Sequence, residues 1–228
     1  MQTIPTTQKH NDEKYLRWST SIREFVGWTN LSKFERFVQP EFLAVEFSCA
    51  GGYLLNNLTS SQKYGIEPGR LAHKVAIEKN SIDAIASADY LEDGWAEFII
   101  LNHLLEDAHN PLRELQRLGS KLKFGCPIIF FVSCESFQHA HKLENVNHHF
   151  YIWKPMCPGN LFHNDGFIVE ESKPHHLRWL LSIYRTTVRI SGCLLFNLRN
   201  RLCAHFDHKL FQVFTITCCR TLVQRRVA

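Results

Sequence analysis

After Pro40, short apolar runs alternate with stretches of helical periodicity, and this alternation constrains the fold more than any other feature of the sequence. Strands that are buried on both faces read as continuous apolar runs, as PIIFFVS does at 127–133. Strands that alternate with helices at this spacing predict a parallel sheet with right-handed crossovers, the α/β class. The expected strands are 43–47, 63–66, 82–86, 96–101, 127–133, 167–171 and 210–217. The expected helices begin near Tyr53 and cover 68–79, 111–122 and 155–165, with Asn110 as the cap of the third.

The two ends of the chain carry different patterns. Apolar residues recur at intervals of three and four between 15 and 38, which predicts a small N-terminal helical cap within residues 1–40. The domain that follows covers 41–228 and is expected to include a basic helical insertion at about 173–208. From Lys173 onward, ten Lys or Arg residues stand against one acid. This excess charge either attracts an anionic substrate, nucleic acid or membrane surface, or forms the solvated faces of two helices.

Length and composition limit the class of protein. The 228 residues suffice for one domain that buries its own core. No apolar stretch approaches the roughly 18 residues of a membrane span, and residues 1–14 lack the apolar core of a secretory signal. The eight cysteines are scattered without CxxC spacing, so we expect reduced thiols and a cytoplasmic protein. No pair among the thirteen histidines has the i, i+4 spacing of a two-histidine zinc site, so no metal is expected.

Polar residues and glycines gather where the expected strands end. An open parallel sheet binds its ligand at the carboxyl ends of its strands, where the strand order reverses. The first such turn reads Glu-Phe-Ser-Cys-Ala-Gly-Gly from Glu46 to Gly52, and glycines there let backbone amides approach a ligand. Glu67 closes the second strand, and its carboxylate can accept two hydrogen bonds from a ribose diol. Asp89 and Tyr90 follow the third strand, and Asn102 follows the apolar part of the fourth.

These motifs, in this order, resemble the class I S-adenosylmethionine-dependent methyltransferases, whose first motif reads roughly (D/E)-x-G-x-G-x-G. Residues 98–107 are similar to the family's fourth-strand segment, and 110–125 to the helix and glycine-rich exit that follow. The resemblance implies a Rossmann-like, mostly parallel seven-stranded sheet with helices on both faces, and S-adenosylmethionine as cofactor. The cofactor contacts that it implies are Glu46, Ser48, Cys49, Ala50, Gly52, Glu67, Asp89, Tyr90 and Asn102.

Departures from the family's pattern leave two functions open. Ser48 and Ala50 stand at positions where the family prefers glycine, and Asp107 stands where it usually has histidine. The chain is therefore either a methyltransferase that acts on a small molecule, at oxygen, or a catalytically impaired pseudoenzyme of the same fold. A nicotinamide-dependent dehydrogenase is disfavoured, because Ser-Cys-Ala-Gly-Gly-Tyr does not supply the G-x-G-x-x-G fingerprint.

Three histidines are candidates for removing a proton from the acceptor. His103 ends the fourth strand, and His148 and His149 follow the fifth, in a loop that lies over the acceptor pocket in this fold. A base is needed only if the acceptor must lose a proton. The expected partner is a small-molecule methyl acceptor. Nucleic acid is not expected, since the chain has no Asn-Pro-Pro-Tyr-type motif and its aromatic residues are not interleaved with basic ones. The oligomeric state stays open.

Overall fold

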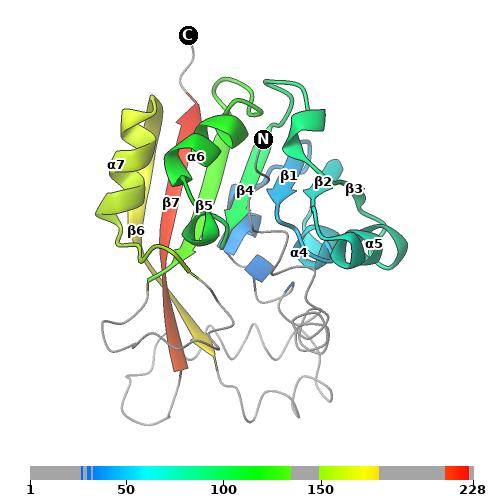
Figure 1. Cartoon of the computed structure of the whole chain (residues 1–228), viewed down its shortest axis with the longest axis horizontal. Coiled ribbons are helices and arrows are strands. Elements are labelled where there is room, and N and C mark those ends of the chain that lie inside the picture. Colours follow the sequence, from blue (N-terminus) through cyan, green and yellow to red (C-terminus); the bar gives the residue numbers. More distant parts are fainter. Residues whose placement is uncertain (1–26, 28–29, 32, 135–148, 180–213, 226–228) are drawn as a thin grey trace.

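A computed structural model of the chain describes residues 27, 30, 31, 33–134, 149–179 and 214–225. Seven strands form one sheet in the order β3-β2-β1-β4-β5-β7-β6 (Figure 1). The strands are β1 Leu43–Phe47, β2 Gln62–Ile66, β3 Asp83–Ile85, β4 Phe98–Asn102, β5 Pro127–Ser133, β6 Phe167–Trp179 and β7 Phe214–Arg225. The helices are α4 Tyr53–Asn57, α5 Arg70–Glu78, α6 Pro111–Gly119 and α7 Met156–Asn164, with short 3-10 turns η1 Glu35–Phe37, η2 Ala88–Tyr90 and η3 Leu105–Asp107.

The first five strands pair in parallel, which confirms the predicted class. β1 pairs with β2 on one side and with β4 on the other. From β1 the strand order therefore runs outward in both directions, and it reverses between β1 and β4. The carboxyl ends of these two strands are Phe47 and Asn102, so the ligand crevice of this sheet is expected beside them.

Two apolar layers cover the sheet. Alternate residues of a strand point to opposite faces, and β5 shows this plainly: Ile128, Phe130 and Val132 belong to one core cluster, Ile129 and Phe131 to the other. The first cluster includes residues of α6 and α7, and the second includes residues of α4 and α5. The continuous apolar run at 127–133 thus reflects burial on both faces.

The last strand differs from the prediction. A strand was expected at 210–217, whereas β7 covers Phe214–Arg225 and lies between β5 and β6, antiparallel to both. Its basic residues interrupt the apolar pattern by which a strand is recognised in the sequence. In the structure these residues have partners, since buried Arg220 pairs with Glu171 at 2.5 Å and Arg225 donates to the Ser120 carbonyl at 3.0 Å. The predicted helical insertion from 173 is also wrong at its start, because β6 continues through Trp179.

The predicted helices that begin near Tyr53 and cover 68–79, 111–122 and 155–165 are present as α4, α5, α6 and α7. Asn110 caps α6 by accepting a hydrogen bond from the Arg113 amide at 3.1 Å. Gly27, Asn30, Leu31, Lys33 and Phe34 are helical, as expected for the end of the N-terminal cap. Residues 1–26 and the rest of the predicted insertion, 180–208, lie outside the described residues, and the domain boundary at 40 stays a prediction.

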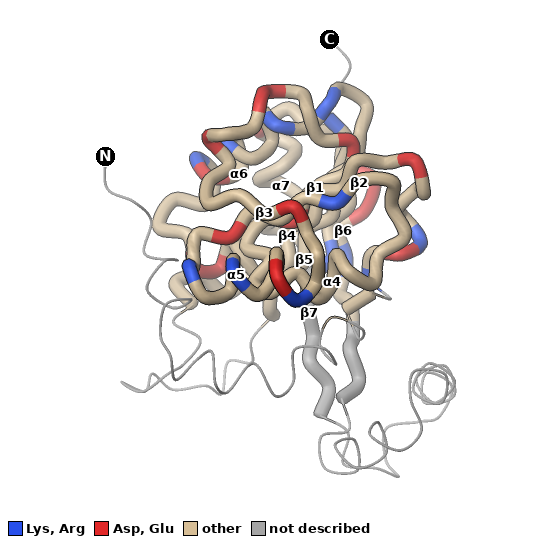
Figure 2. The backbone as a smooth tube through the Cα atoms, turned by 90° about the vertical axis from the view of Figure 1, so that its right-hand side faces the viewer, with Lys and Arg blue, Asp and Glu red and all other residues tan. Residues whose placement is uncertain are grey.

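The cysteines correct one expectation drawn from composition. Cys134 is disulfide-bonded, so the prediction that all eight cysteines are reduced is wrong. Spacing excludes only local pairings, whereas a disulfide can join residues distant in the chain whose Cα atoms approach within about 7 Å. Disulfides are rare in the cytosol, so cysteine usage no longer supports the predicted cytoplasmic location. Among the described residues, basic and acidic positions are interspersed (Figure 2), and no helix is long and apolar enough to cross a membrane.

Candidate functional site

The turn after β1 holds three left-handed residues. Ser48, Ala50 and Gly52 have φ of 58°, 50° and 71°. These are the three positions that the methyltransferase motif fills with glycine, and left-handed backbone is the conformation that favours glycine. Ser48 and Ala50 therefore do not push the turn out of this conformation. They keep it with a Cβ in place, at a cost of roughly 1–2 kcal/mol each relative to right-handed backbone.

Glu67 holds this turn closed from the end of β2. Its Oε2 accepts a hydrogen bond from the Ala50 amide at 2.8 Å, and its Oε1 accepts one from the Gly69 amide at 2.7 Å. The side chain is fully buried. Both oxygens thus bind backbone amides, which is a structural role beside the predicted contact with a ribose. Cys49 packs against Gly65 of β2, since a Cβ added to Gly65 would overlap the Cys49 Sγ.

Glu46, near the end of β1, is a buried carboxyl group with an unsatisfied oxygen. Only 4% of the residue is exposed, and its Oε2 has no hydrogen-bond partner among the described residues. Burial raises the pKa of Glu46 well above its usual value, the charge of Glu67 raises it further, and the charge of Lys33 opposes both. A buried acceptor without a partner is costly, so this oxygen marks a place where a ligand donor would be stabilised.

Lys33 reaches the same place from the segment before β1. The residue is 1% exposed, and its Nζ donates to the Asn102 Oδ1 at 3.2 Å. The Nζ also lies 3.4 Å from the His103 Nε2, and 5.0 Å from the centroid of the Phe131 ring. An ammonium group therefore stands at the carboxyl end of β4. No motif in the sequence singled out this residue.

His103 and Glu106 form a hydrogen-bonded pair directly after β4. The His103 Nδ1 lies 2.9 Å from the Glu106 Oε1, and the Ser133 hydroxyl lies 3.2 Å from the same nitrogen. Glu106 is fully buried, whereas the His103 side chain is 33% exposed. Burial alone would raise the pKa of Glu106, but the hydrogen bond and charge of His103 outweigh it, and the pKa is lowered. An ammonium can only donate, so with Lys33 at Nε2 the ring proton belongs on Nδ1, facing Glu106.

The other predicted site residues do not all lie near Lys33 and His103. Asp89 lies at the surface and pairs with Arg117 at 3.0 Å, and Tyr90 is 76% exposed. His149 lies close enough to Glu106 for its charge to lower that carboxyl's pKa, whereas His148 lies outside the described residues. The structure thus brings Glu46, Asn102 and His103 together around Lys33, and it does not bring Asp89 or Tyr90 to them.

Sequence reasoning missed two members of this cluster. Glu106 follows His103 by three residues, and this spacing was a signal that could have suggested the pair. Lys33 has no such signal, because it lies far from β4 in the chain and meets it only through folding. Within the described ranges, no group of His, Cys, Asp and Glu side chains could hold a metal ion.

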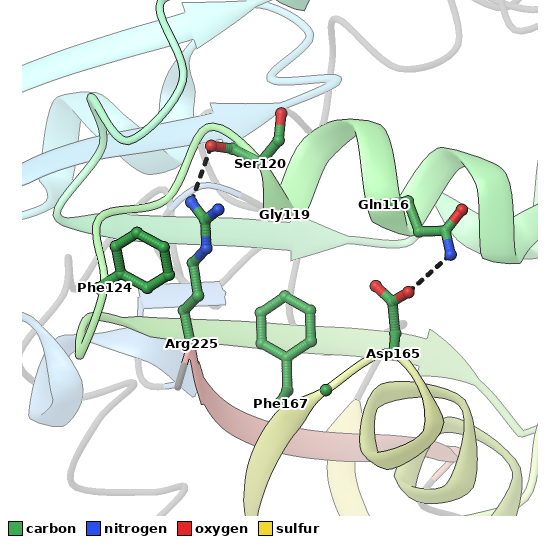
Figure 3. A pocket seen from close by; sticks show the side chains of 8 residues that line it. Gln116, Gly119, Ser120, Phe124, Asp165, Phe167 and Arg225 are labelled. Carbon is green, nitrogen blue, oxygen red and sulfur yellow. Dashed lines mark hydrogen bonds between the residues drawn. The ribbon is translucent and has the colours of Figure 1, made fainter. Parts of the chain in front are cut away.

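A pocket also opens at the opposite edge of the sheet, near the amino ends of β5 and β6 (Figure 3). Gln116 donates to Asp165 there at 2.7 Å, and the Arg225 guanidinium lies 4.2 Å from the Phe124 ring centroid. These polar groups already bind one another, and the pocket is remote from the crevice. We therefore assign the site to the carboxyl edge.

Comparisons with known proteins identify the fold. No family model matches the sequence, and no curated protein matches it either. Solved structures do match. An S-adenosylmethionine-dependent methyltransferase from Thermotoga maritima has a TM-score of 0.64 and 17% identity, over 97% of this chain and 99% of the other. One from Archaeoglobus fulgidus has a TM-score of 0.60 and 13% identity, over 92% and 99%. The [4+2]-cyclase SpnF has a TM-score of 0.56 and 11% identity, over 88% and 81%. The sheet order and these similarities together show that the chain has the fold of the class I S-adenosylmethionine-dependent methyltransferases.

Proposed function

We propose that the chain is an S-adenosylmethionine-dependent methyltransferase that acts on a hydroxyl oxygen of a small molecule. The fold supports methyl transfer in general terms. The observation that supports an oxygen acceptor is the His103–Glu106 pair beside the crevice, with a contact of 2.9 Å. A histidine oriented by a buried carboxylate is the arrangement that removes a proton from a hydroxyl group.

The residues at the crevice fit the cofactor. The unsatisfied Glu46 Oε2 can accept from the cofactor's ammonium or from a ribose hydroxyl. The left-handed turn, with its small residues from Ser48 to Gly52, would lie against the nucleoside. When bound, S-adenosylmethionine supplies an activated methyl group on a sulfonium. The remaining cofactor contacts, Cys49, Glu67, Asp89, Tyr90 and Asn102, stay predictions.

We infer that His103 acts as the base. Glu106 takes the Nδ1 proton in a hydrogen bond, which leaves the Nε2 lone pair as the acceptor. An acceptor hydroxyl that reaches the exposed side of the ring would replace Lys33 as the donor to Nε2. Lys33 would then stabilise the oxygen as it loses its proton. Proton removal of this kind typically contributes 10²–10⁴-fold to rate.

A pseudoenzyme of the same fold is the second candidate, and one observation favours it. Glu67 is fully buried, and both of its carboxylate oxygens accept hydrogen bonds from backbone amides. It therefore has less hydrogen-bonding capacity left for a ribose than the family's pattern implies. The φ of Ala50, 50°, favours the active methyltransferase, because the turn keeps the backbone conformation that glycine would give. Cofactor affinity separates the two candidates.

The first test is calorimetric titration of the purified protein with S-adenosylmethionine and S-adenosylhomocysteine. We expect micromolar binding of at least one, weakened tenfold or more in Glu46→Gln and unchanged in Gln116→Ala, which alters the pocket at the opposite edge. A folded protein that binds neither ligand is the pseudoenzyme.

The second test measures methyl transfer to a panel of phenols and other small hydroxylated compounds. His103 has a φ of 58°, which asparagine tolerates well, so His103→Asn removes the ring without adding backbone strain. We expect His103→Asn to lose transfer by 10²-fold or more while its cofactor affinity is kept. Equal transfer by both proteins would remove His103 from the reaction.

A further inference from the structure

The pocket near the amino ends of β5 and β6 holds two opposite charges that do not pair with each other. Its cavity of about 290 Å³ is close to the lower limit for small-molecule sites. The Arg225 guanidinium and the Asp165 carboxylate both line it, and Figure 3 shows them on either side of the Phe167 ring. Neither group belongs to the proposed reaction, because the pocket lies at the edge of the sheet opposite the crevice.

Arg225 is held by carbonyl oxygens rather than by a carboxylate. Its Nη1 donates to the Ser120 carbonyl at 3.0 Å and also to the Leu122 carbonyl. A hydrogen bond from Lys121 is the main cause of the lowered pKa of Asp93, and the charge of Arg225 adds to it only weakly. Asp93 is thus the partner of Lys121, at 2.7 Å. Within the described residues the Nε and Nη2 of Arg225 have no acceptor, so both can donate to a ligand.

Asp165 is a carboxylate at an electrostatically unfavourable position. It is the C-terminal cap of α7, and the C-terminal end of a helix carries partial negative charge that disfavours an anion. Gly119 and Ser120, at the end of α6, line the same cavity, so a second helix has its negative end there. Gln116 donates to the Asp165 Oδ1 at 2.7 Å, and among the described residues the Oδ2 has no donor. A cationic group that binds Asp165 would therefore be stabilised by the carboxylate and by both helix ends.

Aromatic surface accompanies the two charges. Phe167 is 5% exposed and lines the cavity between them. Phe124 is 55% exposed, and its ring centroid lies 4.2 Å from the Arg225 guanidinium carbon. Gly166 also lines the cavity, and a Cβ added to it would meet no atom within 4 Å, so this wall is open. The pocket thus offers a ligand one cation, one anion and two aromatic rings.

We propose that this pocket binds a small zwitterion, a free amino acid with an apolar side chain. The carboxylate of the amino acid accepts two parallel hydrogen bonds from the Nε and Nη2 of Arg225. Its ammonium group binds Asp165, and its side chain packs against Phe124 and Phe167. A ligand with only one of the two charges leaves the other charged group of the pocket without a partner. The pocket is separate from the crevice, so this inference does not depend on the proposed function.

Calorimetric titration of the full chain with leucine and two of its derivatives tests the two charges separately. Leucinamide lacks the carboxylate, and N-acetyl-leucine lacks the ammonium group. For the wild-type protein we expect leucine to bind with a submillimolar dissociation constant, and both derivatives to bind at least tenfold more weakly. Phenylalanine should bind as leucine does, because the proposal requires an apolar side chain and no particular shape.

Two substitutions assign each charge of the ligand to its partner. Asp165→Asn removes the negative charge but keeps an oxygen for Gln116, so leucine and N-acetyl-leucine should then bind within about twofold of each other. Arg225→Gln should do the same for leucine and leucinamide, whereas Arg225→Lys should keep the preference for leucine. Asp83→Asn in β3 and Arg113→Gln in α6 are matched controls at exposed positions, and they should change none of these affinities.

The contrary outcomes are equally definite. Equal affinities of the wild-type protein for leucine, leucinamide and N-acetyl-leucine overturn the proposal, and so does a preference for leucine that both substitutions leave intact. A folded wild-type protein that binds neither leucine nor phenylalanine overturns it as well. Circular dichroism confirms folding, and if Arg225→Gln unfolds, the comparison of Asp165→Asn with the wild-type protein decides.

A competition experiment separates this pocket from the crevice. The affinity for leucine should be unchanged in the presence of saturating S-adenosylhomocysteine, because the two ligands occupy opposite edges of the sheet. Competition between them would place the amino acid in the crevice and overturn the proposal. A protein that binds leucine but neither S-adenosylmethionine nor S-adenosylhomocysteine would contradict the proposed function alone.

Discussion

Replacing Ala50 with glycine tests whether the turn after β1 carries backbone strain. Ala50 has a φ of 50°, and left-handed backbone costs an L-residue roughly 1–2 kcal/mol, which glycine does not pay. Glycine also makes the unfolded chain more flexible, and this offsets about 0.4–1 kcal/mol. The expected net effect of Ala50→Gly is a stabilisation of about 0.7 kcal/mol. The hydrogen bond from the Ala50 amide to Glu67 is unaffected, because it uses the backbone. Ser48→Gly, at a φ of 58°, should add a similar amount.

Thermal and urea unfolding, followed by circular dichroism, measure this difference. For a domain of this size, 1 kcal/mol shifts Tm by about 2–4 °C, so Ala50→Gly should raise Tm by about 2 °C and the double variant by about 4 °C. Two controls should move the other way. Gly52→Ala puts a Cβ at a φ of 71° and 2.9 Å from the Ile82 Cγ1, and Ala72→Gly weakens helix α5 by about 1 kcal/mol. If Ala50→Gly destabilises the protein as much as Ala72→Gly does, the strain argument is wrong.

Three further substitutions probe the site and its supports. The raised pKa of Glu46 means that its ionised form is disfavoured in the folded state. Glu46→Gln should therefore stabilise the protein at pH 8 by about 1 kcal/mol, and this gain should shrink as the pH falls towards 4.5. A gain that does not depend on pH would contradict this reasoning. Gly65→Ala should destabilise by about 1–3 kcal/mol, because the new Cβ would overlap the Cys49 Sγ. Cys49→Ala in the same chain should recover most of that loss in urea unfolding. Asn110→Ala removes the cap of α6 and should lower the free energy of unfolding by about 1 kcal/mol, whereas Asn110→Asp should retain it.

The parallel half of the sheet could be predicted from sequence because burial on both faces leaves a plain pattern. The strand at 127–133 has the predicted bounds, and the strand at 43–47 does as well. The antiparallel end could not be predicted in this way. β6 and β7 carry polar and charged residues that satisfy one another across the ribbon, as Glu171 and Arg220 do. An ion pair between distant segments has no sequence period, so the sequence alone shows two unrelated charges.

The residues of the candidate site likewise differ in whether the sequence could predict their place. Glu46 and Asn102 could be placed because they end strands, and parallel strands bring their ends to one edge. The partner of His103 could not be assigned, although Glu106 lies only three residues away, because η3 decides whether the two side chains meet. Lys33 could not be placed at all, since its position depends on how the segment before β1 packs against Phe131.

The fold alone does not decide what the crevice does. A [4+2]-cyclase matches this chain with a TM-score of 0.56, and S-adenosylmethionine-dependent methyltransferases match it with 0.64 and 0.60, so the scaffold accommodates different reactions. The side chains at the carboxyl ends of β1 and β4 must therefore decide it. Lys33 contributes a buried ammonium group within reach of Asn102 and His103, and Glu46 contributes a buried carboxyl oxygen without a hydrogen-bond partner among the described residues. In the proposed methyltransferase, Glu46 contacts the cofactor and His103 removes the proton of the acceptor, so Glu46→Gln should lower cofactor affinity whereas His103→Asn should lower turnover alone.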